Sequence, residues 1–334
     1  MKICVVGGTG NISTSIVRLL LDEGHDVTCF SRGQSGSVPS GARHLRGDRM
    51  EREGFEKGMQ DAAFDAAIDM MCFTPDDAES SIRAFRGVEH FIVCSTVASY
   101  GVEFDWLPVT EEHPLRPTTG YGRGKRDADA VFRAAHKAEE FPITIIKPSF
   151  TYGPKWPLLR QISPWKSLEW IDRVRKGKPI VVCGDGDAII QFLHVDDAAP
   201  AFVHVIGRGE CIGETYNMVD RGYTTWAEYH RTVMKVIGRE VEIVGVPFAD
   251  LQRANVPGFG WCVSTGRFHH YFSGEKLMAH VPEFRPSISL ETGIEQVIEA
   301  MDRKGIVGDS DAVTWEDEII TAQRLVQTGL IGEA

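Results

Sequence analysis

The chain has 334 residues, which is enough for two domains or for one large domain with a smaller annex. Hydrophobic residues make up 43% and charged residues 25%, the composition of a globular protein with a substantial core. The formal net charge of -11 disfavours nucleic acid as a partner, and no stretch approaches the ~20 apolar residues that a membrane span needs. We therefore expect a small-molecule substrate and neither a nucleic-acid nor a membrane partner.

Strand and helix signals alternate through the first half of the chain. Short apolar segments predict strands at 2–6, 26–30, 43–46, 64–70, 90–94 and 142–147. Apolar periodicity predicts helices at 11–23, about 51–59, 76–86 and about 120–140. This alternation predicts an α/β fold, a doubly wound parallel sheet of the Rossmann type with helices on both faces.

Regular alternation fades after Pro148. Helices are predicted at about 166–176, 196–206, 224–237, 289–303 and 314–328, and a strand at 214–219 is expected to rejoin the first sheet. We predict a cofactor-binding domain over residues 1–150, with contributions from about 190–220. Residues 151–334 should form mainly a smaller, mixed α/β substrate domain that is interwoven with the first.

The seven cysteines contain no C-x-x-C pair, and several fall in or beside predicted strands. Buried free thiols in a reducing compartment explain this pattern, so we expect a cytoplasmic protein without a metal site. The short N-terminal apolar run enters a glycine loop at once and does not resemble a signal peptide.

The glycine loop directly follows the first strand and opens the first helix. Gly7 permits a tight turn, and Gly10 lets a pyrophosphate approach the backbone. The helix that begins at Asn11 and Ile12 supplies free N–H groups and the positive end of its dipole. The spacing is G-x-x-G-x-x-S rather than G-x-G-x-x-G, and a plain turn is the alternative. The position at the first strand–helix junction favours a dinucleotide site.

The end of the second strand indicates which nicotinamide cofactor binds. A carboxylate is expected there to hold the adenosine ribose, but the chain has Ser31 and Arg32. These two side chains suit a 2′-phosphate, so we expect NADP, with NAD possible. A solvated loop arginine is the alternative for Arg32. Asp48 is expected at the adenine edge, or else as the cap of the following helix.

Tyr121 and Lys125 form a Y-x-x-x-K spacing near a helix start, which places them on one helical face. A nearby ammonium lowers the pKa of a tyrosine, which then exchanges a proton with a substrate hydroxyl or carbonyl. Thr96 and Ser95 follow the fifth strand, at the sheet edge where ligands bind, so either hydroxyl can reach the reacting oxygen. Capping of their own backbone is the alternative.

Several ordered segments resemble one family. They are the loop 7–13, Ser95-Thr96 with Tyr100-Gly101, Tyr121 with Lys125, 147–154 and 192–197. Together they are similar to the NAD(P)-dependent epimerase/dehydratase family, the extended short-chain dehydrogenases/reductases. The resemblance implies Thr96 as the catalytic hydroxyl, Tyr121 as proton donor and acceptor, and Lys125 as the residue that holds the ribose. It also implies Pro148 beside the nicotinamide, and a homodimer is possible because dimers are common in the family.

Two departures narrow the function that the resemblance implies. Val97 and Ala98 stand where 4,6-dehydratases of the family carry Asp-Glu, and neither moves a proton. Ile190 stands where many nucleotide-sugar epimerases have a pyrophosphate-binding arginine; other arginines would have to replace it, namely Arg160, Arg253, Arg267 or Arg285.

Three functions remain after these departures. An NADP(H)-dependent oxidoreductase acting on a carbonyl or hydroxyl is favoured. A nucleotide-sugar epimerase with tightly held NAD is the first alternative. An RNA-binding relative is the second, because Ser31-Arg32-Gly33 and two further segments look similar to chloroplast stem-loop RNA-binding proteins.

Overall fold

The computed structural model describes residues 1–34, 36–164, 168–254 and 256–329. The chain divides into two compact units, each built from several segments. Unit 1 consists of Met1–Thr151, Gln191–Arg221 and Tyr271–Ile288, and unit 2 consists of Tyr152–Ile190, Gly222–His270 and Ser289–Ala334. No helix in the described part of the chain is long and apolar enough to cross a membrane.

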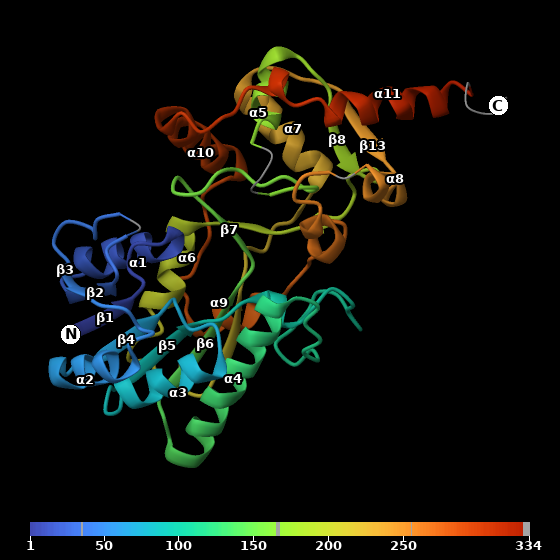
Figure 1. Cartoon of the computed structure of the whole chain (residues 1–334). Helices are drawn as coiled ribbons and strands as arrows, with labels where there is room; N and C mark the ends of the chain where they lie inside the picture. Colours follow the sequence, from blue (N-terminus) through green and yellow to red (C-terminus); the bar gives the residue numbers. More distant parts are fainter. Residues whose placement is uncertain (35, 165–167, 255, 330–334) are drawn as a thin grey trace. The chain divides into compact units, whose positions relative to one another are not determined.

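Unit 1 is built on a seven-stranded parallel sheet with the order β11-β6-β5-β4-β1-β2-β3 (Figure 1). Its strands are β1 (Lys2–Val6), β2 (Asp26–Ser31), β3 (Arg43–Arg46), β4 (Ala66–Asp69), β5 (His90–Cys94), β6 (Ile143–Pro148) and β11 (Thr215–Met218). The predicted doubly wound α/β fold is confirmed. The strand order reverses between β1 and β4, and ligands of such sheets bind outside the carboxyl ends of the strands at this point.

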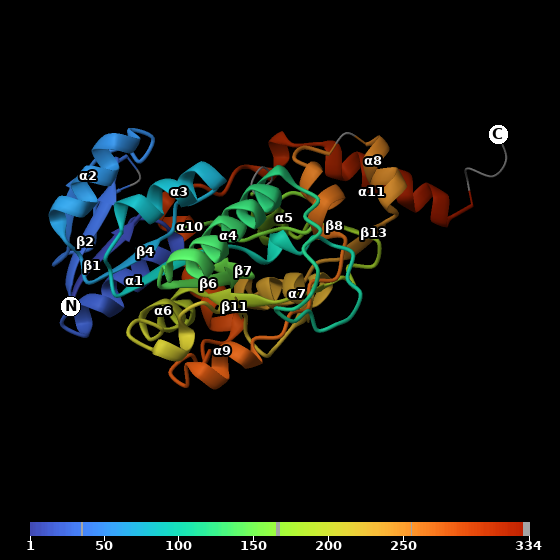
Figure 2. The same ribbon diagram turned by 90° about the horizontal axis from the view of Figure 1, so that it is seen from below.

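Helices cover both faces of this sheet (Figures 1 and 2). They are α1 (Asn11–Asp22) and α6 (Val195–Val203) on one face, and α2 (Arg52–Ala62), α3 (Pro75–Ala84) and α4 (Gly120–Glu139) on the other. Successive residues of β1 point to opposite faces, so Ile3 packs in the core under α1 and α6 while Cys4 packs under α2, α3 and α4.

Residues 271–288 belong to unit 1, although the sequence placed them in the substrate domain. The helix α9 (Glu275–His280) and the segment after it bury Leu277 and Phe284 in the core shared with α1 and α6. Asp197 also accepts hydrogen bonds from the backbone N–H groups of Ser287 (3.1 Å) and Ile288 (2.8 Å). The local periodicity of the sequence does not predict that the chain comes back to unit 1 at these residues.

Unit 2 is smaller and mixed. It contains the parallel pair β8 (Ile180–Cys183) and β13 (Ile243–Val246) and the antiparallel pair β9 (Ile189–Ile190) and β12 (Thr224–Thr225). Its helices are α5 (Trp170–Lys176), α7 (Trp226–Ile237), α8 (Phe248–Arg253), α10 (Leu290–Lys304) and α11 (Trp315–Gln327).

The short strand β7 (Phe150–Tyr152) pairs with β10 (Phe192–His194). The start of the predicted helix 166–176 lies partly outside the described residues.

Candidate active site

Thr96 lies two residues after the end of β5 and opens a single 3₁₀ turn, η1 (Val97–Ser99). Its Oγ1 accepts a hydrogen bond from the backbone N–H of Ala98 at 3.1 Å. The alternative prediction, a hydroxyl that caps its own backbone, is therefore confirmed for the Thr96 oxygen as a hydrogen-bond acceptor. The Thr96 side chain also lies within hydrogen-bonding reach of Tyr121.

Tyr121 and Lys125 lie in the first two turns of α4, which Thr119 caps by accepting the N–H of Gly122 at 3.0 Å. Lys125 is buried, and its Nζ donates to the carbonyl oxygen of Cys94 at 2.6 Å and lies 5.9 Å from the centre of the Tyr121 ring. The structure thus brings the three residues predicted as catalytic together at the carboxyl end of β5.

The pKa of Tyr121 is raised above its ordinary value, mainly because burial disfavours the phenolate. The ammonium of Lys125 and the hydrogen bond with Thr96 act in the opposite direction, as the sequence predicted for the lysine. Tyr121 is nevertheless 50% exposed as a residue. The net pKa is raised because burial outweighs the lowering by Lys125 and Thr96.

A glycine of the Tyr121–Lys125 segment makes this geometry possible. A β-carbon at Gly122 would lie 2.5 Å from the carbonyl oxygen of Ala98, so only glycine lets α4 approach η1 so closely. This role was not predicted from the sequence. Its signal was Gly122 itself, a glycine in the first turn of α4 that local propensity does not explain.

The loop between β1 and α1 has the geometry of a phosphate cradle. Gly7 adopts φ +82°, and a β-carbon there would lie 2.5 Å from Cγ of Met71. Ser13 closes the loop, because its Oγ donates to the carbonyl oxygen of Gly7 at 2.7 Å and accepts the N–H of Gly10 at 2.8 Å. The amide group of Asn11 is buried, and neither its oxygen nor its nitrogen has a hydrogen-bond partner in the described protein. These features fit a bound dinucleotide.

The end of β2 carries a basic cluster, which we define as Arg32, His44 and Arg46 around Ser31. The Ser31 hydroxyl hydrogen-bonds Nε2 of His44 at 2.9 Å, and Ser31 is the register partner of Arg46 in the sheet. Arg32 is exposed and lies 4.0 Å from the carboxylate of Asp48. His44 and Arg46 escaped the sequence analysis because they come from the next strand, and only strand pairing places them beside Ser31.

The other predicted cofactor contacts are placed as follows. Asp48 accepts the N–H of Met50 at 3.0 Å, so it closes the turn before α2 and does not cap the helix itself. Ser95 lies at the predicted strand end, but its hydroxyl points inward and donates to the carboxylate of Asp129 at 2.8 Å. Pro148 ends β6 and is buried. Ile12 is the second residue of α1, as expected.

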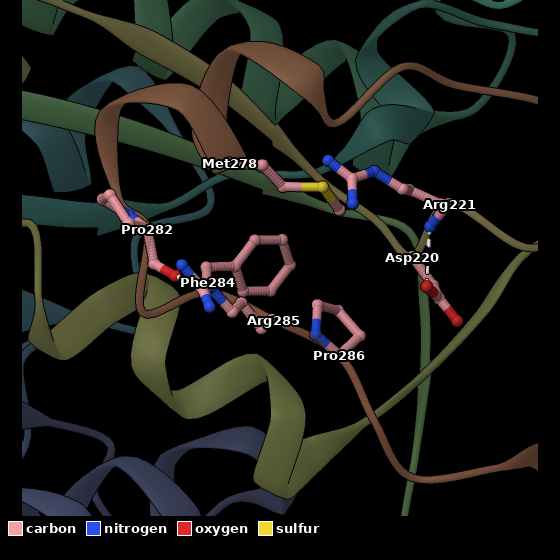
Figure 3. Close-up of a pocket in the computed structure, with 7 residues that line it drawn as sticks. All are labelled: Asp220, Arg221, Met278, Pro282, Phe284, Arg285 and Pro286. Atoms are coloured by element: carbon pink, nitrogen blue, oxygen red, sulfur yellow. Dashed lines mark hydrogen bonds between the residues drawn. The ribbon is translucent and has the colours of Figure 1, made fainter.

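A pocket of about 390 Å³ lies within unit 1 and is shown in Figure 3. Its lining is Asp220, Arg221, Met278, Pro282, Phe284, Arg285 and Pro286. Arg285, one of the arginines offered in place of the one missing at Ile190, donates from Nε to the carbonyl oxygen of Pro282 at 2.6 Å. Arg160, another of them, is buried in an ion pair with Glu316 and is not available to a substrate phosphate.

The model of the NAD dependent epimerase/dehydratase family matches residues 3–218. The chain belongs to this family. The predicted family is thereby confirmed, and with it the prediction of a nicotinamide-dependent enzyme of the oxidoreductase or epimerase type. The match ends at the last residue of β11, so it covers the sheet of unit 1 and the segments that carry Thr96, Tyr121 and Lys125.

Three similar proteins span almost the whole chain. A 2'-dehydrokanamycin reductase of Streptomyces kanamyceticus is 27% identical over 93% of this chain and 87% of the relative. A chloroplast stem-loop binding protein of 41 kDa from Arabidopsis thaliana is 26% identical over 98% and 86%. The solved dTDP-glucose 4,6-dehydratase of Bacillus anthracis str. Ames in complex with NAD has a TM-score of 0.72, with 20% identity over 92% of this chain and 98% of that one. At that identity the structural likeness concerns the fold alone.

Proposed function

We propose that this chain is an NADP(H)-dependent oxidoreductase that reduces a carbonyl group of a small molecule, or oxidises the corresponding hydroxyl. The contact of Tyr121 with both Thr96 and Lys125 is the observation that carries the proposal. A bound nicotinamide supplies or accepts the hydride. Thr96 orients the substrate oxygen, Tyr121 gives that oxygen a proton, and Lys125 stabilises the phenolate that remains.

The raised pKa of Tyr121 supports the reductive direction, because a tyrosine that is protonated at neutral pH is a proton donor. A reductase among the relatives that span the chain supports the same direction. Val97 and Ala98 after Thr96 leave out the acid and base that elimination of water needs, which argues against a dehydratase.

The basic cluster supports NADP as the cofactor. Arg32 follows Ser31 at the end of β2, and His44 and Arg46 lie beside Ser31 from the neighbouring strand. A carboxylate that would repel a 2′-phosphate is absent from Ser31-Arg32-Gly33. Asp48 offsets part of the Arg32 charge, but both side chains are exposed and 4.0 Å apart, so the pair is weak.

The test measures dissociation constants for NADPH and NADH, and NADPH oxidation with a panel of ketones and aldehydes. Arg32→Ala should weaken NADPH binding by ~10–100-fold, the value of one charge-assisted contact, and leave NADH within about 2-fold. Arg43→Ala is the matched control, because Arg43 is likewise an exposed arginine but lies at the start of β3, where it pairs with Asp26 at 2.6 Å. Equal weakening of both cofactors by Arg32→Ala would remove the argument for NADP.

Tyr121→Phe tests the chemical role in the same assay. The variant should bind NADPH like the natural chain and lose turnover by at least ~100-fold, because the proton donor is gone and the ring is kept. Full turnover in this variant would show that Tyr121 is not the donor.

An epimerase that recycles a captive NAD is the second candidate, and membership of the epimerase/dehydratase family favours it. Denaturing the purified protein and identifying the released nicotinamide separates the two. Stoichiometric NAD⁺ would indicate a captive cofactor and overturn the proposal of an exchanging reductase. An empty protein that binds NADPH more tightly than NADH is the expected result.

A further inference from the structure

A buried lysine lies beneath the three residues of the proposed active site. Lys147, in β6, is 1% exposed, and its Nζ donates to the carboxylate of Asp129 at 2.5 Å, to Oγ of Ser99 at 2.7 Å and to Oγ of Ser95 at 3.4 Å. All three of its ammonium protons are therefore used inside the protein. An ionised lysine is seldom buried unless it is paired in this way.

The partners of Lys147 belong to the elements that carry the site. Ser95 precedes Thr96 at the end of β5, and Ser99 ends the turn that Thr96 opens and donates to the carbonyl oxygen of Thr96 at 2.8 Å. Asp129 lies in α4 four residues after Lys125 and eight after Tyr121, on the same helical face. One cation thus connects the strand, the turn and the helix.

We propose that Lys147 is a positioning residue for this site, and that its charge compensates Asp129 so that the proton of Tyr121 is not held more tightly. The proposal rests on the proposed role of Tyr121 as the proton donor. Lys147 does not touch the reacting atoms. It holds Thr96 and α4 in register through Ser99 and Asp129, and it compensates the carboxylate of Asp129, which disfavours the phenolate of Tyr121.

The electrostatic part follows from the charges that face Tyr121. Lys125 favours the phenolate, whereas the carboxylate of Asp129 and the thiol of Cys94 disfavour it. Burial lowers the pKa of Lys147, the neighbouring cations Arg133 and Lys125 lower it further, and the carboxylate of Asp129 acts in the opposite direction. Eight helical residues correspond to ~12 Å, and an unpaired charge at that distance in a medium of effective dielectric ~20 shifts a pKa by about one unit.

The experiment follows the ionisation of Tyr121 by NMR in protein labelled with ¹³C at the tyrosine ζ position, with Tyr121→Phe to assign the signal. Lys147→Met should raise the pKa of Tyr121 by at most about one unit, because Asp129 loses its buried cation. The lowered pKa of Lys147 makes the shift smaller in the alkaline range where the tyrosine titrates. The double variant Lys147→Met/Asp129→Asn should return the pKa to within ~0.3 units of the natural value.

Two controls separate this effect from a general loss of packing. Lys147→Arg keeps the charge and should keep the pKa of Tyr121. Arg160→Met removes a buried cation from unit 2, where Arg160 pairs with Glu316, and should leave the tyrosine unchanged. If Lys147→Met does not fold, Lys147→Gln removes the charge while keeping a donor for Ser99, and the same shift is expected.

Turnover gives the second measurement. Loss of the link to Ser99 and Asp129 should lower kcat of Lys147→Met by ~10–100-fold through misplacement of Thr96 and Tyr121, with KM for NADPH within about 2-fold. An unchanged Tyr121 pKa in Lys147→Met, or a shift that the double variant does not reverse, would overturn the proposal. The titration needs no substrate, so a chain that shows the shift but reduces no carbonyl compound would refute only the proposed function.

Discussion

Replacing Gly122 by alanine should damage the site far more than it damages the fold. The added β-carbon would lie 2.5 Å from the carbonyl oxygen of Ala98 and 3.0 Å from Cβ of Pro117. An ordinary contact needs about 3.5 Å, so α4 and η1 must separate by ~1 Å. The strain costs ~1–3 kcal/mol, but the better helix propensity of alanine offsets about 1 kcal/mol of that cost.

The same ~1 Å movement separates Tyr121 from Thr96, and a misplacement of this size lowers turnover by ~100-fold. Thermal unfolding and kcat for NADPH oxidation should be measured for Gly122→Ala and for Gly120→Ala, which lies in the same helical turn. A β-carbon at Gly120 meets only Nη2 of Arg123 at 3.9 Å, so this control should keep its activity and its stability. Equal kcat in the two variants would refute the close approach of α4 as a condition for catalysis.

Two further predictions concern stability. Burial lowers the pKa of His90 from 6.5 to about 4, so the unfolded chain binds more protons between these pH values. The contribution of neutral His90 to the free energy of unfolding should therefore be complete above pH 6.5 and should fall by up to ~3 kcal/mol towards pH 4. Urea titrations at several pH values should show a smaller fall for His90→Asn. In unit 2, Arg160→Met leaves the buried carboxylate of Glu316 with Arg173 at 3.4 Å as its remaining cation. The free energy of unfolding should fall by less than the ~3–5 kcal/mol expected for a fully unpaired buried charge. It should still fall by more than the ~1 kcal/mol or less expected for Arg175→Met, which breaks an exposed ion pair. Equal losses of the two variants in urea unfolding would contradict this.

The fold of unit 1 could be predicted because its signals are local. Each buried strand is a short apolar run, and each helix shows its own periodicity, so β1 and α1 were expected within a residue of their bounds. The pairs β8–β13 and β9–β12 could not be predicted, because their partners lie more than 30 residues apart and β9 has only two residues. Short strands of this kind form only where tertiary packing brings them together.

The site divides in a similar way. Thr96, Tyr121 and Lys125 were accessible because their spacing reflects chemistry, and Gly7 because its turn has a local requirement. Ser95 was predicted to reach the reacting oxygen, but its side chain points inward to Asp129 and the buried Lys147. A lysine within the apolar strand β6 was itself a signal, because burial of an ammonium requires partners.

The groups around Tyr121 explain why its pKa is raised, which favours the protonated form that can donate a proton. Burial of the hydroxyl end favours the protonated form, and Lys125 alone does not reverse that preference. If Asp129 were unpaired, the phenolate left after proton donation would face a second negative charge along its own helix. As proposed above, Lys147 removes this cost from its buried position between Asp129 and Ser99. In that proposal Tyr121 is the proton donor, and Lys125 is the cation beside the charge that appears when the proton leaves.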